Sequence, residues 1–302
     1  MNFGYNFGRG PAVIPLTSPT APTAQSPVNT LLGSAAGLQI NLVWDSSVRS
    51  ASNWQAIESS ITVAANDFVT ALTTTSHTVI NIAVGFGEVA GSRLSSGALG
   101  QSSSNGYITN YNTVSSALTK ADANMGVNLH GVVSGANYFI TSAEAKALGL
   151  VNGISGVIDG YIGITNNTSA LSFSGTPSAT QYDAAGIAAH EISEVMGRIS
   201  MNGSALAGYS NVYSVLDVLH TGNTFSASIN GKTYTNTFNA ASGGDVGDWA
   251  SGSSANDAFN AFGTPGKVDY ISSVDLVEMA ALGFNPTAAM LVALQTGNGL
   301  IA

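Results

Sequence analysis

The chain has 302 residues, of which 44% are hydrophobic and only 8% are charged, and it contains no cysteine. Its 8 basic and 17 acidic residues give a formal net charge of −9, which leaves no basic patch for nucleic acid or for an anionic membrane surface. Without cysteine, a disulfide framework and a thiolate metal site are both excluded.

The chain carries no sequence signal for the membrane or for an N-terminal export route. No run of about 18 or more apolar residues occurs, as a membrane-spanning helix would need. The first ten residues lack a basic region followed by an apolar one. Low charge and abundant Gly, Ser, Thr and Asn are typical of exported bacterial proteins. We therefore expect a secreted monomer without a cleavable N-terminal signal peptide; finding the protein only in the cytosol of its host would contradict this.

Residues 1–37 have the composition of a flexible segment. Prolines lie among serines, threonines and alanines there, without a periodic apolar pattern: Pro11, Pro15, Pro19, Pro22 and Pro27. A disordered tail and a propeptide that blocks a site both fit this composition. The sequence predicts one folded domain over residues 38–285 and a C-terminal tail over residues 286–302.

The first part of that domain has the pattern of a strand, a helix and a second strand. Residues 38–44 alternate apolar and polar side chains, as a strand does. Residues 52–73 repeat apolar side chains at steps of three and four, as an amphipathic helix does. Residues 77–87 are rich in β-branched side chains. A crossover helix of this length joins parallel strands, so we expect a parallel pair.

The next hundred residues give weaker signals. Residues 88–113 are rich in Gly and Ser and predict a loop, followed by a short helix over residues 114–123. The segment 141–144 has the spacing of a capping box, so a helix should begin there and end near Gly149. Residues 157–164 predict a strand just before the most informative helix of the chain.

That helix is predicted over residues 183–198, about four turns long. Asp183 can cap its first turn with a side-chain oxygen, and Gly197 can help to end it by adopting a positive φ. The remaining positions are mostly Ala, Ile and Val. The ionisable residues on this apolar helix therefore need a specific explanation.

The C-terminal third predicts a hairpin, a loop and a last helix. Residues 224–238 alternate on both sides of Asn230-Gly231, which is a strong hairpin signal. Residues 243–265 predict a loop. A final helix should begin with Ser273 as its cap and end at Gly283.

The loop over residues 243–265 contains two carboxylates between glycines, Asp245 and Asp248. Oxygen ligands in such a turn could hold a structural Ca²⁺ ion. Aspartates that cap the turn with their side chains are the alternative.

His190, Glu191 and Glu194 form a His-Glu-x-x-Glu array on the predicted helix. His190 and Glu194 are four residues apart, so their side chains lie one turn apart on the same face. A helical zinc site uses two such ligands and a carboxylate between them, which takes a proton from water acidified by the metal. The pattern predicts His190 and Glu194 as Zn²⁺ ligands and Glu191 as the catalytic general base.

A structural ion pair is the competing interpretation of the same helix. Glu194 and Arg198 are also four residues apart, in the favourable order for a pair along a helix. The helix would then only pack, and its ionisable groups would be satisfied by neighbouring loops.

A catalytic zinc site needs a third protein ligand. The position ten residues after His190 is Ser200, a poor ligand. The next candidates are Asp217 and His220, of which His220 is the better ligand by chemistry, while Asp217 could instead orient His190. The other two histidines, His77 and His130, are expected to be structural.

Residues 188–198, with the sequence Ala-Ala-His-Glu-Ile-Ser-Glu-Val-Met-Gly-Arg, resemble the active-site helix of bacterial zincin metalloproteases of the metzincin-like kind, near the serralysins and matrixins. Residues 274–283 resemble the helix that closes those catalytic domains, and the order of the predicted elements is similar. The resemblance covers roughly residues 38–284. It departs from the family at Glu194, where the usual motif has a second histidine, and it shows no clear Met-turn.

The resemblance implies an α+β, zincin-like fold, in which a twisted mixed sheet is backed by helices and a smaller C-terminal subdomain follows the active-site helix. It implies a zinc-dependent endopeptidase with a polypeptide substrate, which would pair with an edge strand, expected at residues 157–164. Two alternatives remain: a catalytically degenerate member that acts as a metal-binding or interaction module, and a non-enzymatic surface protein in which the helix merely packs.

Overall fold

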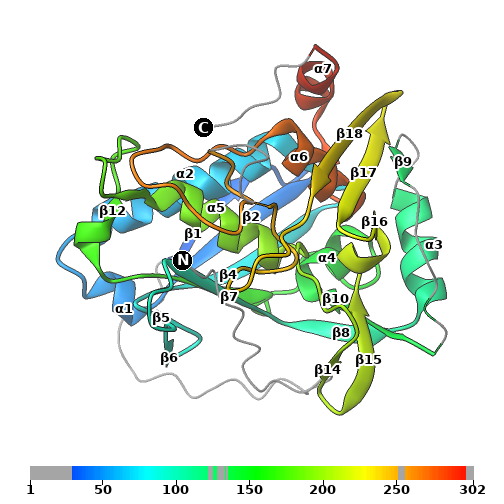
Figure 1. The fold of residues 1–302 in the computed structure, drawn as a ribbon, viewed down its shortest axis with the longest axis horizontal. Helices are drawn as coiled ribbons and strands as arrows, with labels where there is room; N and C mark the ends of the chain where they lie inside the picture. The colour runs from blue at the N-terminus through cyan, green and yellow to red at the C-terminus, as the bar shows by residue number, and fades with distance from the viewer. Residues whose placement is uncertain (1–28, 122–124, 128–132, 134, 251–255, 297–302) are drawn as a thin grey trace.

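The computed structural model describes residues 29–121, 125–127, 133, 135–250 and 256–296 (Figure 1). The expectations for residues 1–28, for His130 and for residues 297–302 lie outside these ranges. The described residues form seven α-helices and several separate sheets, so the α+β class is confirmed. None of these helices is long and apolar enough to cross a membrane.

A mixed five-stranded sheet occupies the centre of the molecule, in the order β1-β2-β4-β11-β7. Its three inner strands run parallel to one another, and each outer strand runs antiparallel to its neighbour. β2 and β4 confirm the two strands and the parallel pairing predicted for residues 38–87. The five strands are β1 (Asn29–Gly33), β2 (Leu38–Trp44), β4 (Thr78–Phe86), β7 (Gly100–Ser104) and β11 (Gly160–Ile164).

The edges of this sheet differ from the sequence expectations. β1 lies within residues 1–37, which were expected to be flexible, and β7 lies within residues 88–113, which were expected to be a loop. β11 was expected at the edge but lies between β4 and β7. Neither outer strand has a long apolar run: β1 has the sequence Asn-Thr-Leu-Leu-Gly, and β7 has the sequence Gly-Gln-Ser-Ser-Ser. These two segments become strands because each forms backbone hydrogen bonds with an inner strand, β1 with β2 and β7 with β11.

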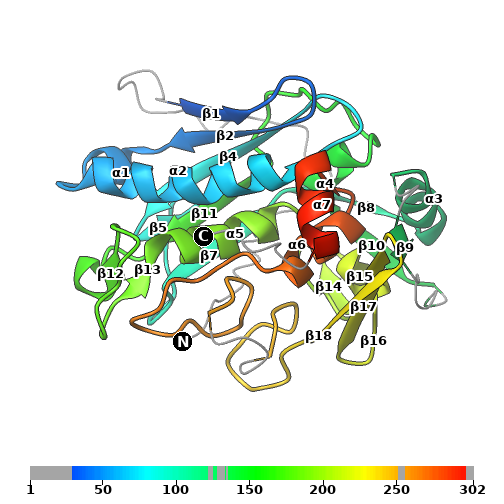
Figure 2. The same cartoon turned by 90° about the horizontal axis from the view of Figure 1, so that it is seen from above.

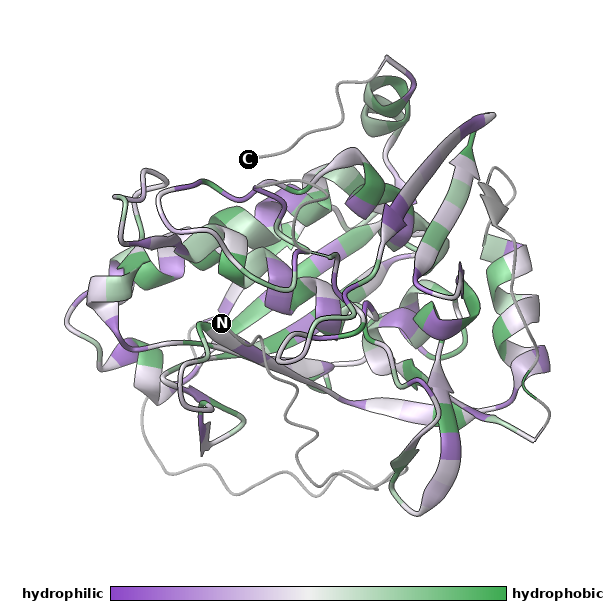
Figure 3. Cartoon of the chain, viewed as in Figure 1, coloured by the Kyte–Doolittle hydropathy of each residue, from purple (hydrophilic) through white to green (hydrophobic). Residues whose placement is uncertain are grey.

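Two helices cover the same face of this sheet, α2 (Trp54–Ala71) and α5 (Ala184–Val195). They contact each other, α2 over β1 and β2 and α5 over β7 and β11, and Figure 2 shows them side by side. The predicted apolar stripe of α2 is buried, with Ile57, Ile61 and Phe68 at 0% exposure. Figure 3 shows hydrophobic residues concentrated on these central helices and strands. A short helix, α1 (Ser46–Arg49), precedes α2.

A second sheet has the order β14-β15-β10-β8. The Thr141 hydroxyl accepts a hydrogen bond from the Glu144 backbone N–H at 3.1 Å, so the helix predicted after residue 141 is confirmed. The elements here are β8 (Gly106–Thr109), α3 (Tyr111–Ala121), β10 (Asn137–Thr141), α4 (Ser142–Ala147), β14 (Ser204–Leu206) and β15 (Tyr209–Ser214).

A third sheet contains the predicted hairpin. Asn230 and Gly231 form its turn with φ values of 49° and 79°, as a tight hairpin turn requires. The strands are β9 (Met125–Val127), β16 (His220–Thr221), β17 (Thr224–Ile229) and β18 (Lys232–Thr237).

The final predicted helix is α6 (Ser273–Ala281), and its cap is Ser272 rather than Ser273. The Ser272 hydroxyl and the Asp275 carboxylate form a reciprocal capping box. The Ser-x-x-Asp spacing of this capping box begins at Ser272, one residue before the predicted cap.

Residues 286–296, the described part of the segment expected as a tail, are part of the fold. It includes α7 (Ala288–Thr296), whose Leu294 side chain is fully buried and whose Leu294 carbonyl accepts a 2.7 Å hydrogen bond from the Tyr234 hydroxyl. Short strand pairs complete the structure: β3 (Leu72–Thr73) with β19 (Asn285–Pro286), β5 (Glu88–Val89) with β6 (Ser92–Arg93), and β12 (Leu171–Ser172) with β13 (Tyr182–Asp183).

Candidate metal centre

Helix α5 lies in the interior of the protein, as its apolar composition predicts. Asp183 caps it by accepting a hydrogen bond from the Ala185 N–H at 3.3 Å. Its ionisable residues are buried with it: His190 and Glu191 are 0% exposed and Glu194 is 4% exposed. Such groups must be paired, neutralised or bound to a cation, because an isolated charge in the interior is unfavourable.

His190 faces two carboxylates. Its Nε2 atom lies 3.3 Å from Glu194 Oε1 and 3.4 Å from Asp248 Oδ1. One ligand atom from each of these three residues lies within 4.8 Å of the others, and no other cluster of three such residues occurs among the described residues. The His190 Nδ1 atom lies 2.8 Å from the Ala258 carbonyl oxygen. Since a carbonyl only accepts, Nδ1 carries a hydrogen, and Nε2 is the ring nitrogen that faces the carboxylates.

These distances match the spacing of zinc ligands. Zinc binds imidazole nitrogen and carboxylate oxygen at about 2.0–2.1 Å, which places two ligand atoms of a tetrahedral site about 3.3–3.4 Å apart. The two distances from His190 Nε2 fall in this range. One imidazole and two carboxylates therefore fit a divalent cation by donor type, and the two distances from His190 fit it by spacing.

Glu191 lies next to this cluster, against strand β7. An alanine Cβ at Gly100 would lie 2.4 Å from Glu191 Oε1, so only glycine permits this approach. Neither carboxylate oxygen of Glu191 receives a hydrogen bond from the described residues. Burial raises the pKa of Glu191 well above its usual range, the negative charges of Glu194 and Asp248 add to the rise, and Arg198 opposes it.

Strand β7 also holds Glu194. The Ser102 hydroxyl donates to Glu194 Oε2 at 2.6 Å, which leaves Oε1 turned toward His190. Burial raises the pKa of Glu194, but His190, Arg198 and Ser102 stabilise the carboxylate more strongly, so its net pKa is lowered. Glu194 is therefore an ionised ligand candidate held by a second contact, as metal-binding carboxylates usually are.

Arg198 lies beside the same carboxylates and is fully buried. Its Nη1 atom donates to Asp248 Oδ1 at 2.6 Å, and its Nη2 atom lies 3.8 Å from Glu194 Oε1. The alternative ion pair between Glu194 and Arg198 is thus present, but the shorter contact is to Asp248. Burial raises the pKa of Asp248 above its usual value although His190 and Arg198 lower it.

The structure does not bring the two expected third ligands, Asp217 and His220, into this cluster. The Asp217 carboxylate accepts hydrogen bonds from the Ser200 hydroxyl at 2.5 Å, from the backbone N–H groups of Met201 and Asn202 at 2.9 Å each, and from the backbone N–H of Ser214 at 2.7 Å. It therefore ties together two loops.

The two other described histidines make local contacts. The His220 ring lies on β16, with Nδ1 2.7 Å from the Gly222 carbonyl oxygen. His77 joins neighbouring strands through a 2.7 Å contact with Gln39, which agrees with the structural role expected for it.

Asp248 is the ligand candidate that sequence reasoning missed. It was noted only with Asp245 as a possible calcium-binding turn. In the structure Asp245 Oδ1 faces the Gly247 N–H at 3.4 Å, while Asp248 is fully buried and turns toward α5. The calcium site stays a prediction. A carboxylate in a Gly-rich loop was a visible signal, but nothing in the sequence placed that loop over His190.

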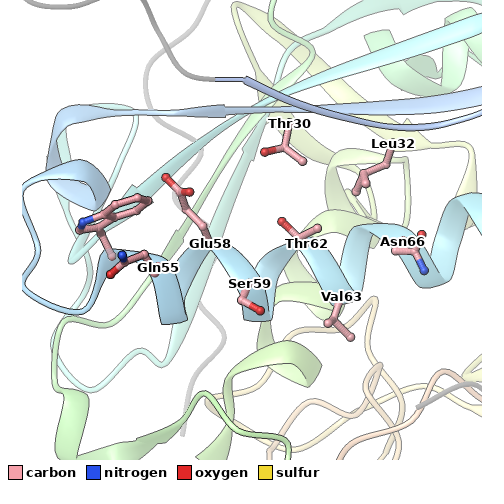
Figure 4. A pocket seen from close by; sticks show the side chains of 9 residues that line it. Thr30, Leu32, Gln55, Glu58, Ser59, Thr62, Val63 and Asn66 are labelled. Carbon is pink, nitrogen blue, oxygen red and sulfur yellow. The ribbon is translucent and has the colours of Figure 1, made fainter.

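A groove on another part of the surface lies between β1 and α2 (Figure 4), with a volume of about 440 Å³. Its one carboxylate, Glu58, pairs with Arg49 at 2.6 Å. The remaining lining side chains are hydroxyls, amides and apolar groups. The groove offers no cluster of ligands or catalytic groups, so the buried centre on α5 is the stronger candidate.

Neither protein-family models, nor curated proteins, nor solved structures gave a match to this chain. The case for a function therefore rests on the residues and geometry of the centre on α5.

Proposed function

We propose that the protein is a secreted zinc-dependent peptidase, with His190, Glu194 and Asp248 as metal ligands and Glu191 as general base. The observation that carries the proposal is the cluster of one imidazole nitrogen and two carboxylate oxygens where a loop meets the buried helix α5. Asp248 replaces Asp217 and His220 as the proposed third ligand.

When bound, zinc supplies Lewis acidity, which acidifies water and polarises a carbonyl group. The residues of the chain do the rest. His190 is held in one tautomer by Ala258, and Glu194 is held by Ser102. Glu191, beside the proposed ligands, accepts a proton from the attacking water and passes it to the leaving amine.

A zincin-like arrangement and a peptide substrate are part of the same proposal. A mixed sheet with two helices on one face, of which the second carries two of the three proposed ligands, supports the resemblance to metzincin-like zincins. In that family a substrate strand pairs with an edge strand. β7 is the outer strand beside α5, and it contacts both Glu191 and Glu194. We therefore propose β7, rather than β11, as the strand along which a polypeptide would bind.

The test combines metal content with peptidase activity. We expect about one zinc ion per chain by elemental analysis of the wild-type protein, and loss of that zinc in His190→Ala and Asp248→Asn. Glu191→Gln should retain zinc but lose hydrolysis of an unfolded polypeptide such as casein. Wild-type protein that takes up no zinc would refute the proposal, and a Glu191→Gln variant of full activity would refute the role of Glu191.

A closed, non-catalytic metal site is the second candidate, and the burial of the centre favours it. His190, Glu191 and Asp248 are all 0% exposed, whereas a catalytic site keeps an open position and a structural site is closed. The protein would then be a degenerate relative that acts as a metal-binding or interaction module. Zinc binding without peptidase activity in wild type, together with a Tm that falls on zinc removal, would select this candidate.

A further inference from the structure

Arg198 reaches the metal centre because the chain reverses at the end of α5. Gly197 adopts a φ of +122°, a conformation that L side chains rarely adopt. The Arg198 N–H then donates back to the Ser193 carbonyl at 3.0 Å. The side chain is thereby directed along the helix toward the ligands rather than into solvent, and it is fully buried.

The Arg198 guanidinium connects the helix that carries His190 to the loop that carries Asp248. Nε donates to the Ser193 hydroxyl at 2.7 Å, and that hydroxyl donates to the His190 carbonyl at 2.6 Å. Nη1 donates to Asp248 Oδ1 at 2.6 Å and to the Gly247 carbonyl at 3.2 Å. The group also lies over the Phe259 ring, 4.4 Å from its centroid. Contacts on several sides leave it little freedom to turn.

Arg198 is fully buried, and a buried charge is tolerated only when it is paired and hydrogen-bonded. Its contacts with Asp248 and Glu194 therefore hold the guanidinium and these carboxylates in fixed positions relative to one another.

We propose that Arg198 is the positioning residue of the metal centre: it holds Asp248 in place as the third ligand. This inference rests on the proposed function. A carboxylate oxygen that binds a metal commonly accepts a hydrogen bond as well, and loss of such a partner typically lowers metal affinity 10–100-fold. If Arg198 instead competed with the metal for the Asp248 carboxylate, replacing Arg198 would raise the metal affinity.

The test is the affinity for Zn²⁺, measured by competition with a chromophoric chelator, together with the absorption spectrum of the Co²⁺-loaded protein. We expect Arg198→Met to weaken Zn²⁺ binding about 10–100-fold and to alter the Co²⁺ bands. Arg198→Lys keeps the charge but not the fork of donors, so we expect a smaller loss. Ser193→Ala removes the hydroxyl that accepts from Nε and donates to the His190 carbonyl but leaves the contact between Arg198 and Asp248, so we expect a still smaller loss in the same direction. Circular dichroism and thermal melting report whether each variant is folded.

Arg49→Met is the matched control, because Arg49 also pairs with a carboxylate and stacks on a ring but belongs to the surface. It should bind Zn²⁺ as wild type does. Wild-type or tighter Zn²⁺ affinity in Arg198→Met would overturn the inference; if that variant does not fold, unchanged affinity and an unchanged Co²⁺ spectrum in Ser193→Ala would overturn it. A wild-type protein that binds neither metal would instead overturn the proposed function, and with it the inference.

Discussion

Replacing Gly100 with alanine should both destabilise the protein and displace Glu191. The new Cβ would lie 2.4 Å from Glu191 Oε1 and 2.8 Å from Ile187 Cγ2, and both neighbours belong to the buried helix α5. Ile187 is β-branched and cannot turn away freely, so the contact must be relieved by a shift of β7 or of the Glu191 carboxylate. Overpacking of this kind costs about 1–3 kcal/mol. At about 2–4 °C per kcal/mol for a large domain, the Tm should fall by roughly 2–12 °C.

The assay is thermal unfolding followed by circular dichroism, with zinc content and peptidase activity measured on the same preparations. Gly156→Ala is the matched control, because its new Cβ would meet nothing within 4 Å, and its Tm should be unchanged or slightly raised. On the proposed function, Gly100→Ala should keep zinc and lose most of the peptidase activity, since Glu191 is the group it displaces. A wild-type Tm and wild-type activity in Gly100→Ala would refute the close packing of Glu191 on β7.

Two further predictions concern charges away from the candidate metal centre. Lys146→Met should lower the free energy of unfolding, measured in urea, by about 3–5 kcal/mol, because it leaves the buried Asp159 without its partner at 2.6 Å. Arg49→Met, at a surface pair, should lower it by only about 0–1 kcal/mol. Equal losses in the two variants would contradict this prediction. Burial and two neighbouring aspartates raise the pKa of Asp269 to about 8, so the folded state holds a proton that the unfolded state has lost above about pH 4. Stability should therefore fall as the pH rises from about 4 to 8, and Asp269→Asn should show a smaller fall in Tm between pH 5 and pH 8; an identical fall would contradict the shift.

The sequence by itself determined those elements whose residues carry a local, periodic signal. Three such signals each lie within a single element: the alternation in β2, the apolar stripe of α2 and the Asn-Gly turn between β17 and β18. The His190 and Glu194 pair belongs to the same class, because four residues along a helix place two side chains on one face whatever surrounds them. These features follow from backbone geometry and from the burial of one face.

Only the tertiary structure decided how distant segments meet. The Gly-Gln-Ser-Ser-Ser segment of β7 has no strand signal and becomes a strand because β11 offers it hydrogen-bonding partners. Asp217 and Asp248 are both carboxylates in loops, but backbone donors surround the first while Arg198 and His190 face the second. Which of them approaches α5 depends on the packing of loops far apart in the chain. No local pattern encodes that packing, since it results from the sum of many contacts.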